Sequence, residues 1–350
     1  MQLKDTLIRQ IQNHGPIGVD RFMEAAVSYY YAKNPAIGAE GDFITSPEIS
    51  QLFGEMIGIW LADCWIKMGQ SPSIALLECG PGRGTLMADI LRATRHISGF
   101  HQALSVTLLE ASSAMRERQR QALETVWLGD ICWIDSLAEF VPEIPVLIVG
   151  NEFLDALPMR QYQKTTDGRW MERVIGWSEE QGFHFGLRDS VVELNVSACM
   201  AGQIFEVSPQ RENFIRSCAD LVTSQGGAGL FIDYGHLRSS AGETLQAVKD
   251  HKKCGVFDFL GEADITSHID FGALVDCLQG TKSFTTSQSV FLQRLGITHR
   301  IGALKTKTTP EQFIQLERGF ERLVSDTQMG KLFKVFGFCS NDFDSLTGFE

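Results

Sequence analysis

The chain has 350 residues, of which 44% are hydrophobic and 21% are charged, and its formal net charge at pH 7 is −12. This length suffices for one large α/β domain with insertions or for two smaller domains, and the composition is ordinary for a globular protein. The acidic balance argues against broad binding of a nucleic-acid backbone, which needs a basic surface.

The first 70 residues are predicted to be mainly helical. The N-terminal stretch begins an amphipathic helix that carries Asp5, and it lacks both the apolar core of a signal peptide and the composition of a transit peptide. We therefore expect a cytoplasmic protein. A second helix is expected from Asp20 and a third from Pro47 to Trp60, with Ser46 as its cap. No apolar stretch reaches the ~20 residues that a membrane span requires.

From residue 74 onward, short apolar runs alternate with helical patterns. Strands are expected at residues 74–77, 105–110, 131–134, 146–150, 229–234 and 332–338. Helices are expected at residues 85–91, 114–123, 209–224, 269–275 and 310–325. Strands separated by helices predict an α/β fold with a parallel sheet that is covered on both faces.

A long insertion separates the fourth expected strand from the fifth. Strand-like runs within residues 159–187 are split by turn signals, which predicts a β-rich excursion. We expect residues 71–158 and 209–350 to form the core and residues 159–208 to form this insertion on the substrate side. Residues 1–70 would form a helical segment and a lid, and the chain after Gly235 is expected to be a polar loop up to the helix at residue 269.

The turn after the first expected strand is the most informative part of the sequence. Glu78 is followed by three alternating glycines, Gly80, Gly82 and Gly84. Glycine permits positive φ and a close approach of a ligand to the main chain, and a helix N-terminus presents free N–H groups. Dinucleotide sites carry G-x-G-x-x-G with an acid about 20 residues later. Here the acid precedes the first glycine, where it would repel a pyrophosphate and suit a cationic amino acid. The turn therefore resembles the first motif of class I S-adenosyl-L-methionine methyltransferases.

Acidic residues near two further strands are candidates for binding the nucleoside part of that cofactor. Glu110 ends the second expected strand, where a carboxylate can accept hydrogen bonds from both ribose hydroxyls. Asp130 precedes the third expected strand, where adenine contacts often arise, and this signal is weak. Both residues are also compatible with a solvated acid at the end of a strand.

The fourth expected strand ends in a second acidic motif. Asn151, Glu152 and Asp155 leave a buried strand and enter a loop over the same crevice. A pair of carboxylates there could orient a guanidinium and remove the proton that is lost on methyl transfer. Capping of a helix together with salt bridges is the structural alternative.

Residues 41–50 form a dense polar stretch before the third expected helix. Asp42, Ser46 and Glu48 could place a helix N-terminus that closes over the cofactor. An ordinary well-capped helix would explain the same residues.

A metal site is not expected. The eight cysteines are scattered and form no C-x-x-C pair, so reduced and mostly buried thiols are predicted. Acids and His268 within residues 261–270 match no standard ligand spacing, and we expect His268 to have a structural or substrate-side role.

Taken together, these stretches resemble the MidA-like methyltransferase family, which includes a mitochondrial complex I assembly factor that methylates arginine. The matching stretches are GDFITSPEISQLFGE, LLECGPGRGTLMADILR, VTLLEAS, NEFLDALPMRQY, IDYGH, GETLQAVKDHK, GEADITSHIDF and MGKLFKV. They occur in the order typical of the family, from about residue 40 to residue 337. The loop at residues 254–260 matches less well.

The resemblance implies a Rossmann-like class I methyltransferase fold with a seven-stranded sheet, S-adenosyl-L-methionine as cofactor and a protein arginine as acceptor. The acceptor protein would be a subunit of the complex I type, and the oligomeric state is left open. On this basis the cofactor would be bound by Glu78, Gly80, Gly82, Gly84, Glu110, Asp130, Asn151 and Ser46. Catalysis would involve Glu152, Asp155, Asp42 and Glu48, with no metal.

Two other functions remain open from the sequence alone. The chain could keep the fold and the cofactor pocket and act only as an assembly chaperone for a respiratory subunit. A nicotinamide-dependent oxidoreductase is the weaker alternative, because the position of Glu78 disfavours a dinucleotide.

Overall fold

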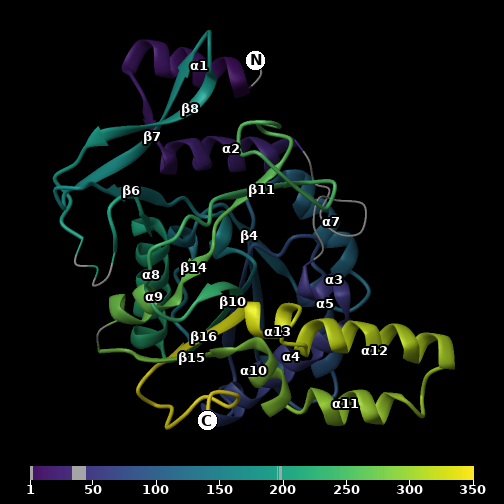
Figure 1. The fold of residues 1–350 in the computed structure, drawn as a ribbon. Helices are drawn as coiled ribbons and strands as arrows, with labels where there is room; N and C mark the ends of the chain where they lie inside the picture. The colour runs from purple at the N-terminus through teal and green to yellow at the C-terminus, as the bar shows by residue number, and fades with distance from the viewer. Residues whose placement is uncertain (1–2, 34–44, 195, 197–198, 279) are drawn as a thin grey trace.

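The computed structural model describes residues 3–33, 45–194, 196, 199–278 and 280–350. Its centre is a mostly parallel sheet, with β10, β16 and β15 at one side (Figure 1). Seven strands follow the order β15-β16-β10-β5-β2-β3-β4. The strands are β2 (Ile74–Cys79), β3 (Leu104–Leu109), β4 (Ile131–Ile134), β5 (Val146–Asn151), β10 (Gly227–His236), β15 (Lys282–Ser287) and β16 (Phe333–Cys339). β16 runs antiparallel to both of its neighbours, and the short β14 (Ile269–Asp270) pairs with the end of β10. This confirms the predicted α/β methyltransferase-like sheet.

Alternate residues of the central strands pack into two separate cores, one on each face of the sheet. Ile74 and Leu76 of β2 face a core that contains α4 (Gln51–Lys67) and α5 (Thr85–Thr94). Ala75 and Leu77 face the core that contains α8 (Pro209–Gln225) and α9 (Phe271–Cys277). Burial on both faces explains why these strands are apolar throughout, as parallel strands are when helices cover both faces.

The helix expected from Pro47 to Trp60 is interrupted, which corrects the sequence prediction. The short α3 (Ser46–Ile49) ends before Ser50, whose backbone is extended and whose hydroxyl accepts a hydrogen bond from the N–H of Leu52 at 3.3 Å to cap α4. Gly319 of α12 (Pro310–Val324) packs against this break, where an added Cβ would lie 2.9 Å from that of Ser50. The break therefore depends on a helix that lies about 270 residues further along the chain.

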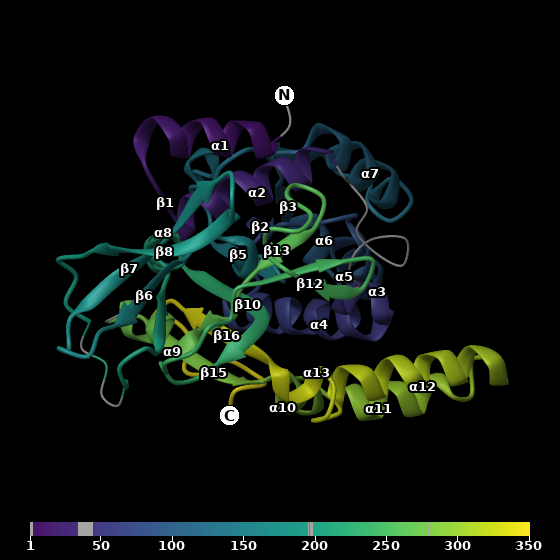
Figure 2. The ribbon, with the colours of Figure 1, turned by 45° about the horizontal axis from the view of Figure 1, so that its top comes forward.

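The insertion forms its own antiparallel sheet, in which strands were expected within residues 159–187, whereas the strand at Ile204–Val207 was not predicted. It comprises β6 (Arg160–Lys164), β7 (Trp170–Ser178), β8 (Gly182–Asp189) and β9 (Ile204–Val207), joined at one edge by β1 (Ile17–Gly18). Figure 2 shows this sheet at the opposite end of the molecule from α11 (Ile297–Leu304) and α12.

A third core joins segments from three distant parts of the sequence. It includes buried side chains of α1 (Leu3–His14) and α2 (Val19–Lys33), the insertion, and a three-stranded sheet of β11 (Gln246–Lys249), β12 (Lys252–Cys254) and β13 (Asp264–Thr266). The prediction of a polar loop after Gly235 is therefore wrong. Ala247 and Ile265 are buried in the third core and hold these short strands against it. The first 70 residues are thus shared between two cores, and the predicted segment boundaries stay a prediction.

Further elements were not predicted from the sequence. They are β15, α11, α6 (Phe100–Ala103), α10 (Gln288–Arg294) and α13 (Met329–Leu332), with the 3₁₀ turns at Leu137–Glu139 and Leu154–Ala156. α7 (Ser113–Leu123) lies where a helix was expected. None of the described helices is both long enough and apolar enough to cross a membrane.

Candidate functional site

A cavity of about 460 Å³ lies at the carboxyl ends of β2, β3, β4 and β5. Its size falls within the range of ~300–1,000 Å³ that is common for sites binding small molecules. The strand order reverses between β2 and β5, and such a switch point is where open α/β sheets bind ligands. Predicted site residues that line the cavity are Glu48, Glu78, Gly80, Gly82, Glu110, Asn151 and Glu152.

The glycine turn forms the floor of this cavity. Gly80, Gly82 and Gly84 have φ angles of +65°, +52° and +85°, which L side chains rarely adopt. A Cβ on Gly80 would also lie 2.7 Å from the ring of Phe153, so this position has no room for a side chain. Gly84 is the N-cap of α5, which directs the free N–H groups of that helix toward the turn.

Glu78 is a buried carboxylate with an unused oxygen. It is the fifth residue of β2 and is 2% exposed, and within the described part of the chain Oε2 has no hydrogen-bond partner. Burial raises the pKa of Glu78 from its usual 4.5 to about 8. A buried acid without a partner is unfavourable in its ionised form. An ammonium group placed in the cavity would supply the missing donor and restore the charge.

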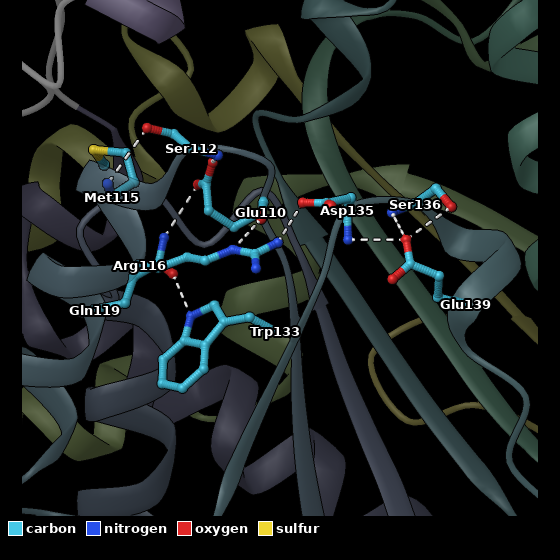
Figure 3. Close-up of polar contacts among 9 residues, drawn as sticks. All are labelled: Glu110, Ser112, Met115, Arg116, Gln119, Trp133, Asp135, Ser136 and Glu139. Carbon is cyan, nitrogen blue, oxygen red and sulfur yellow. Dashed lines mark hydrogen bonds and ion pairs between the residues drawn. The ribbon is translucent and has the colours of Figure 1, made fainter.

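Glu110 is held in place by a network that also supports the glycine turn (Figure 3). Its carboxylate accepts hydrogen bonds from the N–H of Ser112 at 2.8 Å and from the amide of Gln119 at 3.1 Å. The same Gln119 amide donates to the carbonyl of Gly82 at 2.8 Å and accepts from the indole of Trp133 at 2.8 Å. Burial raises the pKa of Glu110, and these donors oppose the rise. The network fixes the carboxylate at the cavity wall, with lone pairs left for hydroxyl donors.

Asp135, which was not predicted, takes the position that was expected for Asp130. Asp130 precedes β4 and is exposed, and its backbone carbonyl accepts from the indole of Trp127 at 3.2 Å. The structure does not bring it to the cavity, because ligands bind at the carboxyl ends of strands and Asp130 lies at the amino end of β4. Asp135 and Ser136 follow β4 and line the cavity, and Arg116 contacts Asp135 at 2.6 Å. The strand-end rule would have indicated Asp135 from the sequence.

The short helix α3 connects the glycine turn to the loop after β5. The N–H of Ser46 donates to Oε1 of Glu152 at 2.9 Å, and the hydroxyl of Thr85, the first residue of α5, donates to Glu48 at 2.5 Å. Glu48 lines the cavity, whereas Ser46 is fully buried and does not. Asp42 lies outside the described residues.

Glu152 faces the cavity from an unusual backbone conformation. Its φ is +51°, which is a strained value for a residue that is not glycine. Its Oε1 also accepts from the side-chain amide of Asn151 at 3.1 Å. Burial raises the pKa of Glu152 to about 7, and the hydrogen bond from the N–H of Ser46 opposes this. A carboxylate with a pKa near neutral pH is suited to accept a proton.

Asp155 does not line the cavity. It is 6% exposed, and its carboxylate accepts a short hydrogen bond from the hydroxyl of Tyr234. Burial raises its pKa, and the bond from Tyr234 opposes the rise. The structure therefore places Asp155 in the same loop as Glu152, with its carboxylate bound to Tyr234 and not among the cavity-lining residues.

Some lining residues gave no signal in the sequence. Val27 and Tyr31 come from α2, and Phe214 comes from α8. Their positions follow from the packing of distant helices, which no local pattern reveals. In the described part of the chain, no group of three or more His, Cys, Asp or Glu residues could hold a metal ion.

The donor set of the cavity fits S-adenosyl-L-methionine. Glu78 offers an ammonium a carboxylate oxygen to which no described residue donates, and the glycine turn leaves space for a chain against the backbone. Glu110 offers acceptors to a diol, and Leu109, Ala111 and Leu137 give apolar walls beside Asp135.

Comparisons with known proteins agree with this geometry. A family model described as "Putative S-adenosyl-L-methionine-dependent methyltransferase" matches residues 56–290. The chain is 33% identical to protein arginine methyltransferase NDUFAF7, mitochondrial, of Mus musculus, over 94% of this chain and 82% of that protein. It is 32% identical to the Caenorhabditis elegans homologue of the same name, over 95% of this chain and 85% of that protein.

Two solved structures from Burkholderia thailandensis share the whole fold. One, crystallised with S-adenosyl-homocysteine bound, has a TM-score of 0.87 and 27% identity, and the match covers 99% of this chain and 93% of that one. A native crystal structure from the same organism has a TM-score of 0.82 and 28% identity, over 99% and 94% of the two chains.

Proposed function

This chain belongs to the S-adenosyl-L-methionine-dependent methyltransferase family, and we propose that its methyl acceptor is an arginine side chain of a protein. The observation that carries the proposal is the carboxylate of Glu152, which faces the cofactor cavity with a pKa of about 7. The names of the relatives, which describe protein arginine methyltransferases, support the same acceptor.

The residues of the glycine turn and the adjacent strand ends would hold the cofactor. Glu78 would bind its ammonium group, Gly80 and Gly82 would lie against its methionine part, and Glu110 would accept from the ribose. Asp135 would lie beside the adenine. Bound S-adenosyl-L-methionine supplies a methyl group on a positively charged sulfur. The chain itself contributes mainly position and charge, which are large terms when a reacting centre is held in line.

Glu152 would orient the acceptor and take its proton. A guanidinium beside this carboxylate favours its ionised form, because opposite charges at short range lower the pKa of an acid. As the methyl group moves from sulfur to a guanidine nitrogen, that nitrogen loses one proton, and Glu152 would accept it. The backbone of Ser46 holds the same carboxylate, so α3 would fix its direction.

The roles of the other predicted residues are narrower in this proposal. Asp155 would act through Tyr234 and the loop, since it does not line the cavity. Glu48 would join α3 to the glycine turn. The lid role of Asp42 stays a prediction.

The acceptor protein and the location also stay predictions. A subunit of the complex I type is implied by the family resemblance. The cytoplasmic location expected from the sequence is untested, and the names of the relatives place those proteins in mitochondria.

Radiolabelled methyl transfer into a lysate of cells that lack this gene tests the proposal. We expect one labelled protein band, with methylarginine identified by mass spectrometry, and no band with Glu152→Gln. Label on another residue type would overturn the arginine assignment. If Glu152→Gln and the wild type capture the same protein in a pull-down and neither methylates it, the result would favour an assembly chaperone.

A further inference from the structure

Arg211 is a buried cation that the cofactor cavity does not use. It lies in the first turn of α8, where its N–H donates to the hydroxyl of the N-cap Ser208 at 3.2 Å. Its side chain is therefore at the carboxyl edge of the central sheet, close to the loop that follows β5. The residue is only 4% exposed.

The guanidinium of Arg211 binds two loops at once. It donates to the carbonyl of Leu154 at 2.8 Å and to the carbonyl of Asp155 at 3.0 Å, both in the loop after β5. It also donates to the hydroxyl of Ser267 at 2.7 Å and to the carbonyl of His268 at 2.9 Å. Ser267 returns a bond from its N–H to the carbonyl of Asp155 at 3.2 Å. Four of the five guanidinium donors available in principle are thus directed at these two loops.

Asp233 holds the same loop from its amide side. This residue of β10 is 1% exposed, and its Oδ2 accepts from the N–H groups of Leu154 at 3.0 Å and Asp155 at 3.1 Å. Its Oδ1 accepts from the N–H of Tyr234 at 2.9 Å. The peptide groups of Leu154 and Asp155 are therefore held at their carbonyls by Arg211 and at their amides by Asp233. We call Arg211 and Asp233 the loop clamp.

The loop clamp buries charged groups, and removing charges from water costs free energy. The four hydrogen bonds of Arg211 go to neutral oxygens, so its buried charge is balanced only at longer range, by the carboxylates of Asp233 and Asp155. Replacing buried charges by packed apolar residues is often neutral or stabilising, so stability alone does not explain this arrangement. What the clamp provides is a fixed geometry for the loop that starts at Glu152, where φ is +51°. Such a conformation persists only when its surroundings determine it.

We propose that Arg211 and Asp233 are positioning residues that hold the loop after β5 so that the carboxylate of Glu152 faces the methyl acceptor. This inference rests on the proposed role of Glu152. The loop clamp touches neither the cavity wall of the glycine turn nor Glu78 and Glu110. Its loss should disturb the loop at residues 152–157 directly and reach the glycine turn only through the ring of Phe153, which packs against Gly80.

Hydrogen exchange and kinetics of Arg211→Lys and Arg211→Met test the loop clamp. Lysine keeps the charge but lacks the planar fork that reaches several acceptors, so both variants should behave alike. We expect faster exchange in peptides covering residues 152–157 and a much smaller change in residues 76–84. Methyl transfer should fall by about 10²-fold, the effect of a displacement of roughly 1 Å at a reacting group. Calorimetric affinity for S-adenosyl-homocysteine should stay near that of the wild type.

The matched control is Arg216→Met on the same helix, since Arg216 is exposed and paired with Glu212. It should change neither exchange nor methyl transfer. If Arg211→Met fails to fold, Asp233→Asn and Ser267→Ala give the same test with smaller losses. Unchanged exchange at residues 152–157, or equal losses of ligand affinity and methyl transfer, would overturn the proposal. Because exchange needs no acceptor, a wild type that methylates no arginine would sink the proposed function and still leave the loop clamp to be judged.

Discussion

The two ends of the cavity are built from different parts of the chain. At the glycine-turn end, Glu78 and Glu110 belong to or directly follow β2 and β3, so the strands themselves place them. At the Glu152 end, the partners come from far away in the sequence. Ser46 is 106 residues from Glu152, and Tyr234 is 79 residues from Asp155. The acids of the glycine-turn end are therefore placed by segments that lie near one another in the chain, whereas the Glu152 end depends on contacts between distant segments.

Replacement of Glu152 should separate the two ends most clearly. Glu152→Gln keeps an oxygen that can accept from Ser46 but removes the proton acceptor, so methyl transfer should fall by about 10²–10⁴-fold. Binding of S-adenosyl-homocysteine, measured by calorimetry, should hardly change. Glu117→Gln, at an exposed position on α7, is the control. Equal activity of Glu152→Gln and wild type would show that Glu152 does not accept the proton of the methyl acceptor.

Replacement of Glu78 should have the opposite pattern. Glu78→Gln removes the carboxylate that would bind the ammonium of the cofactor, and a hydrogen bond to a charged group contributes about 1.5–3 kcal/mol, or roughly 10–100-fold in affinity. The loss should appear in the dissociation constant, with methyl transfer recovered at saturating cofactor. A lower maximal rate with unchanged affinity would contradict the division between the two ends.

The pH dependence of the glycine-turn end follows from the same residue. In the free protein Glu78 has a pKa of about 8, so below that pH it is mostly protonated and must ionise to bind an ammonium. Affinity should then fall by about tenfold per pH unit between pH 8 and pH 6. Calorimetry in buffers of different ionisation enthalpy should detect released protons, and Glu78→Gln should abolish that release.

Stability of the free protein should show the reverse trend. The pKa of Glu78 in the folded state is raised above its usual 4.5, so its contribution to stability is full below pH 4.5 and is lost as the pH rises through 8. The thermal unfolding temperature of the wild type should therefore fall between pH 4.5 and pH 8 relative to that of Glu78→Gln. A parallel pH profile of the two proteins would rule out the buried state of this acid.

The smallest loss of ligand affinity is predicted for Asp135, which would lie beside the adenine. Asp135→Ala should weaken binding of S-adenosyl-homocysteine by about 2–10-fold, the range of one ordinary hydrogen bond. Asp130→Ala should leave it unchanged, because Asp130 is exposed and does not line the cavity. If the two results were exchanged, the glycine-turn end would extend to the amino end of β4.

The features that could be predicted from the sequence are those that depend on short segments of the chain. The strands, the glycine turn and the two acids at the ends of β2 and β3 follow from local patterns of apolar residues, glycine and charge. The position of Asp130 was misjudged because the strand was recognised but the wrong end of it was chosen. Nothing local marks Tyr31 or Arg211 as residues of this region, since their places depend on how α2 and α8 pack.

The same reason explains the errors in the fold. Strands β11 to β13 are short and polar, and Ala247 and Ile265 bury them against the third core. The break at Ser50 depends on the approach of Gly319. Each of these features results from contacts between residues that are far apart in the chain, which periodicity and propensity do not report.

The third core also has a consequence for folding during synthesis, because it cannot form fully until its last segment has been made. Its first members, Leu3 to Ala26, leave the ribosome long before Ile265, with which they share a buried cluster. Contacts across such a long loop form slowly, because the loss of chain entropy precedes the gain from burial. The apolar faces of α1 and α2 therefore lack part of their core until Ala247 and Ile265 have been made. In that interval a nascent chain exposes apolar surface on which it can aggregate or bind chaperones.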